Sequence, residues 1–154
     1  MIVRKMIKEE FDSTIILTRY YCDEAAEAMP YLEEEFDENS IIDTVRTHSS
    51  QVNYCWFNAY DNNRPVGFIA GFISQCPWNK DILDANIHFL YLLESHRTLE
   101  NFRELLNKFE EWARAYKCKN INAGDIGVNP ERFKKIFERY GFKEKLLMTR
   151  GVEQ

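Results

Sequence analysis

Residues 85–92 read Ala-Asn-Ile-His-Phe-Leu-Tyr-Leu, and together with the two elements that follow they decide the fold. Most of these positions are apolar, which is typical of a central strand buried on both faces. Apolar side chains then recur at steps of three and four, which predicts a helix over 98–117. A short strand is predicted at 120–124. Because two strands joined through one helix usually run parallel, we expect 85–92 and 120–124 to form a parallel pair.

Upstream of this unit, the sequence favours an antiparallel hairpin. Residues 54–60 are aromatic and β-prone, and 66–73 form an apolar run that contains two glycines. Between them, the sequence Asp-Asn-Asn-Arg-Pro at 61–65 is a strong turn signal. A loop is predicted at 76–80, before the strand at 85–92. The sheet is therefore expected to be mixed, with antiparallel and parallel pairs.

The N-terminal part of the chain predicts one strand and two helices. Residues 2–6 are short and half apolar, which favours a first strand, and apolar side chains at helical spacing predict a helix over 8–22. The stretch 23–38 holds eight carboxylates and no lysine or arginine. Pro30 interrupts this stretch, so it is predicted to be at most a broken helix. Ser40 is the expected N-cap of the second helix.

The C-terminal part predicts one more helix and a closing strand. Asn129 followed by proline is typical of a helix start, and Gly141 is typical of a helix end. A closing strand or strand pair is predicted within 142–152. Taken together, the elements predict an α+β (α/β) domain with a mixed central sheet flanked by helices. The apolar side of the late helix is expected to consist of Phe133, Ile136, Phe137 and Tyr140.

Composition excludes several classes of protein. The chain has 154 residues, of which 45% are hydrophobic and 29% charged, and its net charge is −5. This length predicts a single domain over 1–154, and the acidic balance excludes a uniformly basic nucleic-acid binder. No apolar run reaches the roughly 18 residues of a membrane-spanning helix. Because the cysteines form no CxxC pair and no signal peptide is predicted, we expect free thiols in the cytoplasm. The histidines show no metal-ligand spacing, so no metal site is expected.

Charge is distributed unevenly along the chain. Residues 1–96 carry 7 basic and 16 acidic side chains, whereas residues 97–154 carry 13 basic and 9 acidic ones. The first part therefore has a net charge of −9 and the second a net charge of +4. This asymmetry predicts one acidic flank and one mildly basic flank on the folded protein.

Five stretches carry a pattern along the chain: 64–69 (Arg-Pro-Val-Gly-Phe-Ile), 92–97 (Leu-Leu-Glu-Ser-His-Arg), 105–113, Asn129-Pro130 and 137–142 (Phe-Glu-Arg-Tyr-Gly-Phe). In this order they resemble the GNAT superfamily of acyl-CoA-dependent N-acyltransferases, and in style the sequence is similar to small GNAT-like proteins of tailed bacteriophages. The resemblance implies a sheet that opens after its fourth strand and holds acetyl-CoA there, with the pyrophosphate on the N-terminus of the following helix.

The resemblance also implies a set of residues that bind acetyl-CoA. Arg97 and the backbone amides of the helix start are implied to hold the pyrophosphate, and backbone groups of the strand at 85–92 are implied to line the pantetheine arm. The family has glycines in this loop at the positions of Glu100 and Phe102, and glycines allow a close approach to phosphate. The residues implied to bind acetyl-CoA are Leu90, Leu92, Arg97, Leu99, Asn101, Phe102 and Asn129.

The catalytic positions of the family are altered in this chain. The position of the common general base is Asn86, and the position of the tyrosine that protonates the leaving thiolate is Phe137. Two nearby side chains are candidate substitutes. His88 lies two residues beyond Asn86, on the same face of the strand, and its ordinary pKa suits a base. Tyr140 lies about one helical turn beyond Phe137. The alternative is that both side chains only pack in the core.

Two functions therefore stand as hypotheses. The first is an N-acetyltransferase that moves an acetyl group from acetyl-CoA to a primary amine of a basic small molecule or protein. The acidic stretch 23–38 favours such a cationic acceptor. The alternative is a catalytically degenerate GNAT fold that serves as a binding or structural component, for example in a phage virion or against a host protein. Neither hypothesis involves nucleic acid or membrane, and both leave open a monomer or a homodimer.

Overall fold

The computed structural model describes residues 1–124, 129–145, 150 and 152 of the chain. The chain divides into two compact units, Met1–Gly124 and Asp125–Gln154. The prediction of a single domain over 1–154 stays a prediction. The elements of the first unit are β1 (Ile2–Lys5), α1 (Phe11–Ala28), α2 (Glu38–Ser50), β2 (Tyr54–Asp61), β3 (Arg64–Cys76), β4 (Asn79–Leu92), α3 (Leu99–Ala115) and β5 (Asn120–Ala123), with 3-10 helices at Lys8–Glu10, Pro30–Glu34 and Glu94–His96.

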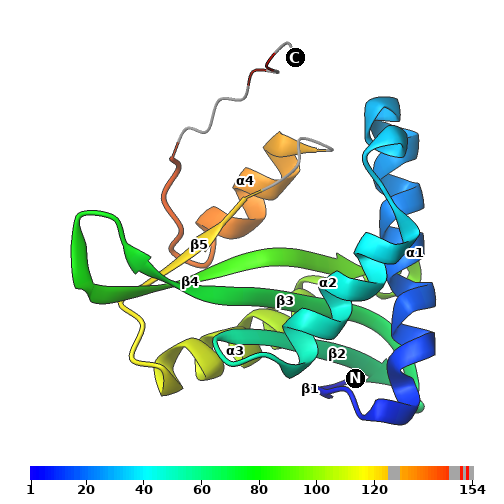
Figure 1. Ribbon diagram of the computed structural model, residues 1–154, viewed down its shortest axis with the longest axis horizontal. Coiled ribbons are helices and arrows are strands. Elements are labelled where there is room, and N and C mark those ends of the chain that lie inside the picture. The colour runs from blue at the N-terminus through cyan, green and yellow to red at the C-terminus, as the bar shows by residue number, and fades with distance from the viewer. Residues whose placement is uncertain (125–128, 146–149, 151, 153–154) are drawn as a thin grey trace. The chain divides into compact units, whose positions relative to one another are not determined.

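The first unit is built on a five-stranded sheet with the order β1-β2-β3-β4-β5. Each neighbouring pair from β1 to β4 is antiparallel, and β4 pairs with β5 in parallel. Figure 1 shows β4 and β5 side by side, with α3 between them in the chain. The predicted hairpin, the predicted parallel pair and the mixed sheet are thus confirmed.

Helices cover both faces of this sheet. On one face, side chains of α1 and α2, such as Ile15 and Val45, form a cluster with Trp56, Phe68 and Tyr91 of the sheet. On the other face lies α3, whose side chains Leu105, Leu106 and Phe109 are almost fully buried. Apolar positions at helical spacing allow α3 to bury one stripe against a sheet, which is the usual two-layer solution for such elements.

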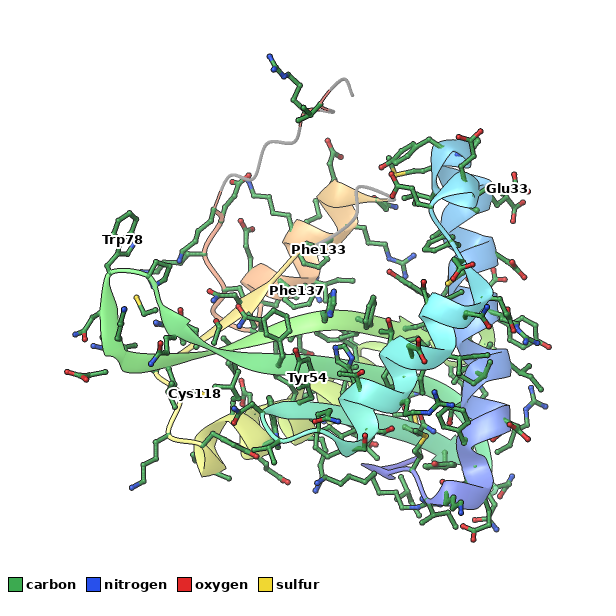
Figure 2. The ribbon with its side chains drawn as sticks, viewed as in Figure 1. Glu33, Tyr54, Trp78, Cys118, Phe133 and Phe137 are labelled. Atoms are coloured by element: carbon green, nitrogen blue, oxygen red, sulfur yellow. The ribbon has the colours of Figure 1, made fainter. Side chains whose placement is uncertain are left out.

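The β3–β4 hairpin is longer than predicted. Cys76 pairs with Asn79, so the two strands continue through most of the predicted loop at 76–80 and β4 begins well before 85. At the outer end of the hairpin, where β4 begins, the side chains on both faces are largely exposed. Polar and charged residues therefore occupy both faces, and the alternation of apolar and polar residues that would predict a strand is missing. Trp78 lies at the tip with 93% of its surface exposed (Figure 2).

Two predictions about the N-terminal helices were wrong in their boundaries. A 3-10 turn precedes α1, and α1 continues beyond 22 to Ala28, because the residues that follow Cys22 include strong helix formers such as Ala25. Pro30 then starts a short 3-10 helix. The N-cap of α2 is Asp37 rather than Ser40: the Asp37 carboxylate accepts hydrogen bonds from the Ser40 backbone N–H at 2.9 Å and hydroxyl at 2.8 Å.

A hydrogen-bonded network anchors the start of α1 to β1 and β2. Glu10 accepts two hydrogen bonds from the Arg4 guanidinium, one from the Ile7 backbone N–H at 3.0 Å, and a short one from the Tyr60 hydroxyl. Tyr60 in turn accepts from the buried Asn58 side chain at 3.1 Å. Because every member has a partner, the network can be buried without a large desolvation cost.

Glu10 is expected to make stability depend on acidic pH. The Arg4 hydrogen bond, together with those of Tyr60 and Ile7, lowers the pKa of Glu10 from 4.5 to about 2. Its contribution is therefore complete above pH 4.5 and is lost as pH falls through about 2. Glu10→Gln should cost about 1–3 kcal/mol at pH 7 in denaturant unfolding, and this gap to wild type should narrow at pH 2. The exposed neighbour offers a control, Glu9→Gln, and an equal loss in that variant would contradict the prediction.

The second unit contains α4 (Pro130–Glu138). The Asn129 side chain caps it by accepting from the Arg132 backbone N–H at 3.2 Å. Phe137 stacks on Phe133 with ring centroids 4.2 Å apart, and Gly141 follows with a φ of 82°, as the predicted helix end requires. Within the predicted closing strand, 142–145 carry no regular secondary structure, and 146–149 and 151 lie outside the described residues.

Candidate active site

The parallel pairing of β4 and β5 is short. It joins 84–87 of β4 to β5 and stops there. Within the described residues, no strand pairs with the rest of β4, 88–92, along this side. We call 88–92 the open edge of β4. A strand edge of this kind presents backbone N–H and C=O groups that can bind an extended ligand.

The open edge begins with a β-bulge at His88. On β3, Ala70 pairs with Phe89 and the next residue, Gly71, pairs with Ile87, so His88 has no partner in the register. A bulge redirects side chains. Here it places consecutive rings side by side, since His88 stacks on Phe89 with centroids 4.1 Å apart.

Asn86 and His88 are predicted to lie on the same face of β4, and both lie next to Phe72 of β3. Asn86 pairs with Phe72 in the register, and the His88 ring lies 5.6 Å from the Phe72 ring. The Asn86 amide donates to the Ser74 hydroxyl at 2.9 Å, and its oxygen accepts from Asn122 of β5 at 3.1 Å. Asn86 thus helps to hold β5 against β4, and it is not a proton acceptor for catalysis.

His88 hydrogen bonds to a second histidine, His48 of α2. The distance from His48 Nε2 to His88 Nδ1 is 3.1 Å, and the distance from His48 Nδ1 to the Thr44 carbonyl oxygen is 2.8 Å. His48 is 4% exposed, whereas His88 lies at the surface. Burial lowers the pKa of both imidazoles. For His48, burial outweighs the hydrogen bond to the Thr44 carbonyl, which raises the pKa, and the neighbouring His88 lowers it further. Both rings are therefore neutral at pH 7.

The N-terminus of α3 follows the open edge after a short turn. Thr98 caps the helix, and its hydroxyl accepts from the Asn101 backbone N–H at 3.1 Å. The Asn101 side chain donates to the His96 carbonyl at 2.9 Å, which fixes the turn. Phe102 is 7% exposed, so its ring packs in the core and not over the helix end. Glu100 lies exposed in the first turn.

Arg97 is bound within the protein. Its Nε donates to the Leu92 carbonyl at 2.8 Å, and its Nη2 donates to Glu24 of α1 at 2.6 Å. Partial burial raises the pKa of Glu24, but the hydrogen bonds from Arg97 and Tyr91 outweigh it, so the net shift is downward. The Arg97–Glu24 pair ties the β4–α3 turn to α1. The predicted role of Arg97 as a phosphate ligand stays a prediction.

The structure groups most of the predicted site residues along one segment. His88, Leu90 and Leu92 lie on the open edge, and the turn and first helical turn after it hold the rest of the predicted set in this unit. Asn129 and Tyr140 belong to the second unit. Tyr140 lies in the turn after α4, not within the helix, and is half-buried. The predicted residues that follow the open edge are Arg97, Leu99, Asn101 and Phe102.

Sequence reasoning missed two hydrogen-bond partners of the predicted site residues, His48 and Glu24. His48 is separated from His88 by 40 residues, and Glu24 from Arg97 by 73. Neither pair has a spacing within one element that would reveal it. Only the packing of α1 and α2 against the sheet brings them together.

The segment fits acetyl-CoA in most respects. The open edge offers backbone groups to an extended pantetheine chain, and the N-terminus of α3 favours an anion. Phe102 leaves the helix end accessible because its ring is in the core. Glu100 opposes the fit, since a carboxylate in the first turn repels a phosphate.

Comparison with family models places the chain in a known family. The model of the acetyltransferase (GNAT) family matches residues 15–142. The chain therefore belongs to the acetyltransferase (GNAT) family. This confirms the resemblance and the predicted α+β fold, and it confirms acetyl-CoA as the expected cosubstrate. No curated protein sequence matches the chain.

Solved structures share the fold over nearly the whole chain. The aminoglycoside acetyltransferase AAC(6')-Iy with a bisubstrate analogue of CoA has a TM-score of 0.76 and 14% identity, covering 98% of this chain and 97% of that chain. AAC(6')-IG from Acinetobacter haemolyticus has a TM-score of 0.74 and 12% identity, covering 100% and 99%. A ribosomal-protein-alanine N-acetyltransferase from Brucella melitensis biovar Abortus 2308 has a TM-score of 0.69 and 12% identity, covering 100% and 99%.

No helix among the described residues is both long enough and apolar enough to cross a membrane.

Proposed function

We propose that this protein is an N-acetyltransferase that moves the acetyl group of acetyl-CoA to a primary amine of a cationic small molecule or protein. The open edge of β4 carries this proposal, because it starts at the exposed His88 and leads into the N-terminus of α3. One continuous segment thus offers a candidate base, a backbone surface for an extended chain and an anion site.

Acetyl-CoA would be held mainly by backbone groups. The open edge, including Leu90 and Leu92, is proposed to bind the pantetheine arm. The first turn of α3, from Leu99 to Phe102, is proposed to bind the pyrophosphate through its N–H groups and the positive end of the helix dipole. Arg97 adds a cation beside this helix end. Asn129 belongs to the second unit, and its contact with the CoA arm stays a prediction.

Two side chains are proposed to move protons. Acetyl-CoA supplies an activated thioester, and the acceptor amine must lose a proton as its nitrogen forms a bond to the acetyl carbon. His88 is proposed to accept that proton at Nε2, as general base. The sulfur takes up a proton when its bond to the carbon breaks, and Tyr140, which belongs to the second unit, stays the predicted donor. Asn86 and Phe137 can perform neither step.

The acceptor is proposed to be cationic. The stretch 23–38 extends from the end of α1 into the start of α2, and most of its eight carboxylates are exposed. Glu24 and Glu38 pair with Arg97 and Arg19, which leaves the acidic character of the rest of the stretch in place. Such a field attracts polycations. The aminoglycoside acetyltransferases among the similar structures support an acceptor of this kind.

We also propose a cytoplasmic location. All four cysteines are free in the structure, and two of them, Cys22 and Cys55, are buried. Free thiols are typical of a reducing compartment.

Calorimetric titration with acetyl-CoA and CoA tests the proposed function. We expect saturable binding, followed by release of free thiol when polyamines and aminoglycosides are added as acceptors. No heat and no thermal shift at millimolar ligand would contradict the acetyltransferase proposal. That result would favour the alternative of a GNAT fold used only for binding or structure.

Glu100 is expected to weaken CoA binding. Its carboxylate lies in the first turn of α3, where the pyrophosphate is proposed to bind. Glu100→Gln and Glu100→Gly should both tighten CoA binding about fivefold, which corresponds to about 1 kcal/mol for one repulsive charge pair. The control is Glu104→Gln, one helical turn further on, where little change is expected. Equal affinities in all three variants and wild type would show that the phosphates bind elsewhere.

A further inference from the structure

The partners of the two histidines determine where their protons lie. A carbonyl oxygen only accepts hydrogen bonds, so the Thr44 carbonyl 2.8 Å from His48 Nδ1 requires a proton on that nitrogen. His48 lies on α2 with Tyr54, Trp56 and Phe89 around its ring. In such surroundings it is neutral at pH 7, since burial lowers the pKa of His48. Its Nε2 therefore carries a lone pair.

The same reasoning assigns the proton of His88. Its Nδ1 lies 3.1 Å from His48 Nε2, and a hydrogen bond between them needs one donor. Because His48 Nε2 is the acceptor, His88 Nδ1 carries the proton. A neutral imidazole holds only one N–H, so the lone pair of His88 is on Nε2, the nitrogen on the opposite side of the ring from His48.

We propose that His48 is a positioning residue that holds His88 in the Nδ1–H tautomer and leaves His88 Nε2 as the proton acceptor. This inference rests on the proposed function, because it gives His88 its task in catalysis. The packing supports it: the bulge places His88 against Phe89, and Phe72 flanks the ring on β3. The ring is thus held by stacking while His48 fixes its protons.

Two substitutions of His48 separate the hydrogen bond from the bulk of the side chain. His48→Gln keeps an acceptor, the amide oxygen, for the His88 Nδ1–H. His48→Leu fills similar space without an acceptor. Spectra of ¹⁵N-histidine-labelled protein at neutral pH report which ring nitrogen of His88 is protonated. His96→Gln removes the third histidine and so assists the assignment of signals.

In these spectra, wild type and His48→Gln should show His88 protonated at Nδ1. In His48→Leu, the proton of His88 should no longer be held mainly on Nδ1. In kinetics, His48→Leu should lower kcat by about 10- to 100-fold, part of the full effect of a general base, with KM for acetyl-CoA within twofold. His48→Gln should restore most of kcat. Protonation of wild-type His88 at Nε2 would overturn the inference, and so would an unchanged tautomer and kcat in His48→Leu.

The spectra need neither CoA nor turnover, so the outcome is separate from that of the proposed function. If acetyl-CoA fails to bind while His88 shows the Nδ1–H tautomer, the acetyltransferase proposal fails and the His48–His88 hydrogen bond stands. If acetyl-CoA binds and His88 is protonated at Nε2, the role of His48 fails. Should His48→Leu not fold, wild type and His48→Gln still decide the tautomer.

Discussion

Gly71→Ala is expected to destabilise the protein by about 3 kcal/mol or more, at the upper end of what overpacking costs. A Cβ atom at Gly71 would lie 2.1 Å from the Asn86 carbonyl oxygen and 2.6 Å from Cε2 of Phe109. The first contact is with the backbone of the neighbouring strand, which cannot yield as a flexible side chain would. The backbone of β4 must therefore shift relative to β3, and the Phe109 ring must move as well. Denaturant unfolding at pH 7 measures the loss.

Gly124→Ala is the matched control for this prediction. Among the described residues, nothing lies within 4 Å of a Cβ atom at Gly124, so the variant should unfold within about 1 kcal/mol of wild type. Equal stability of Gly71→Ala and Gly124→Ala would show that the bulge region adapts to an added methyl group. Since Gly71 pairs with Ile87 beside the bulge, any Gly71→Ala protein that folds should also show a disturbed His88 signal.

The order of the helices and strands could be predicted from the sequence because each element has a local sequence pattern. The steps of three and four in α3 predicted its helix, and the turn sequence at 61–65 predicted the hairpin. The parallel pairing of β4 with β5 followed from the helix between them. The ends of the helices and strands were harder to predict from the sequence. The outer part of the β3–β4 hairpin is exposed on both faces, so no apolar pattern reports it.

The site was predictable only where it is contiguous in the chain. Family resemblance was sufficient to select the segment from Leu90 to Phe102. A mostly apolar strand gives no sign that it holds an extra residue, so the bulge at His88 could not be predicted from the sequence. His48 was equally hidden, because its contact with His88 depends on the packing of α2 against the sheet. The two histidines come together only in the folded protein, and nothing in the sequence indicates that they pair.

His88→Ala is expected to lower kcat for acetyl transfer by about 10²- to 10⁴-fold, the usual contribution of a general base. KM for acetyl-CoA should change little, because backbone groups are proposed to hold that substrate. His88 acts as a base only when its Nε2 is unprotonated. Burial lowers the pKa of His88 from 6.5, so wild-type kcat should fall as pH drops through a value below 6.5. Within the described part of the chain, His48 and the rings of Phe72 and Phe89 contact His88.

The acidic limb of the pH profile distinguishes this role from a structural one. A variant that merely loosened the sheet would lower kcat at every pH and keep the limb, whereas His88→Ala should lose the limb together with the rate. The counterpart, Tyr140→Phe, removes the proposed acid and leaves His88 in place. It should therefore lower kcat while the acidic limb remains. If His88→Ala retains both the rate and the limb, the acceptor amine must lose its proton by another route, such as a chain of water molecules, and the base is not His88.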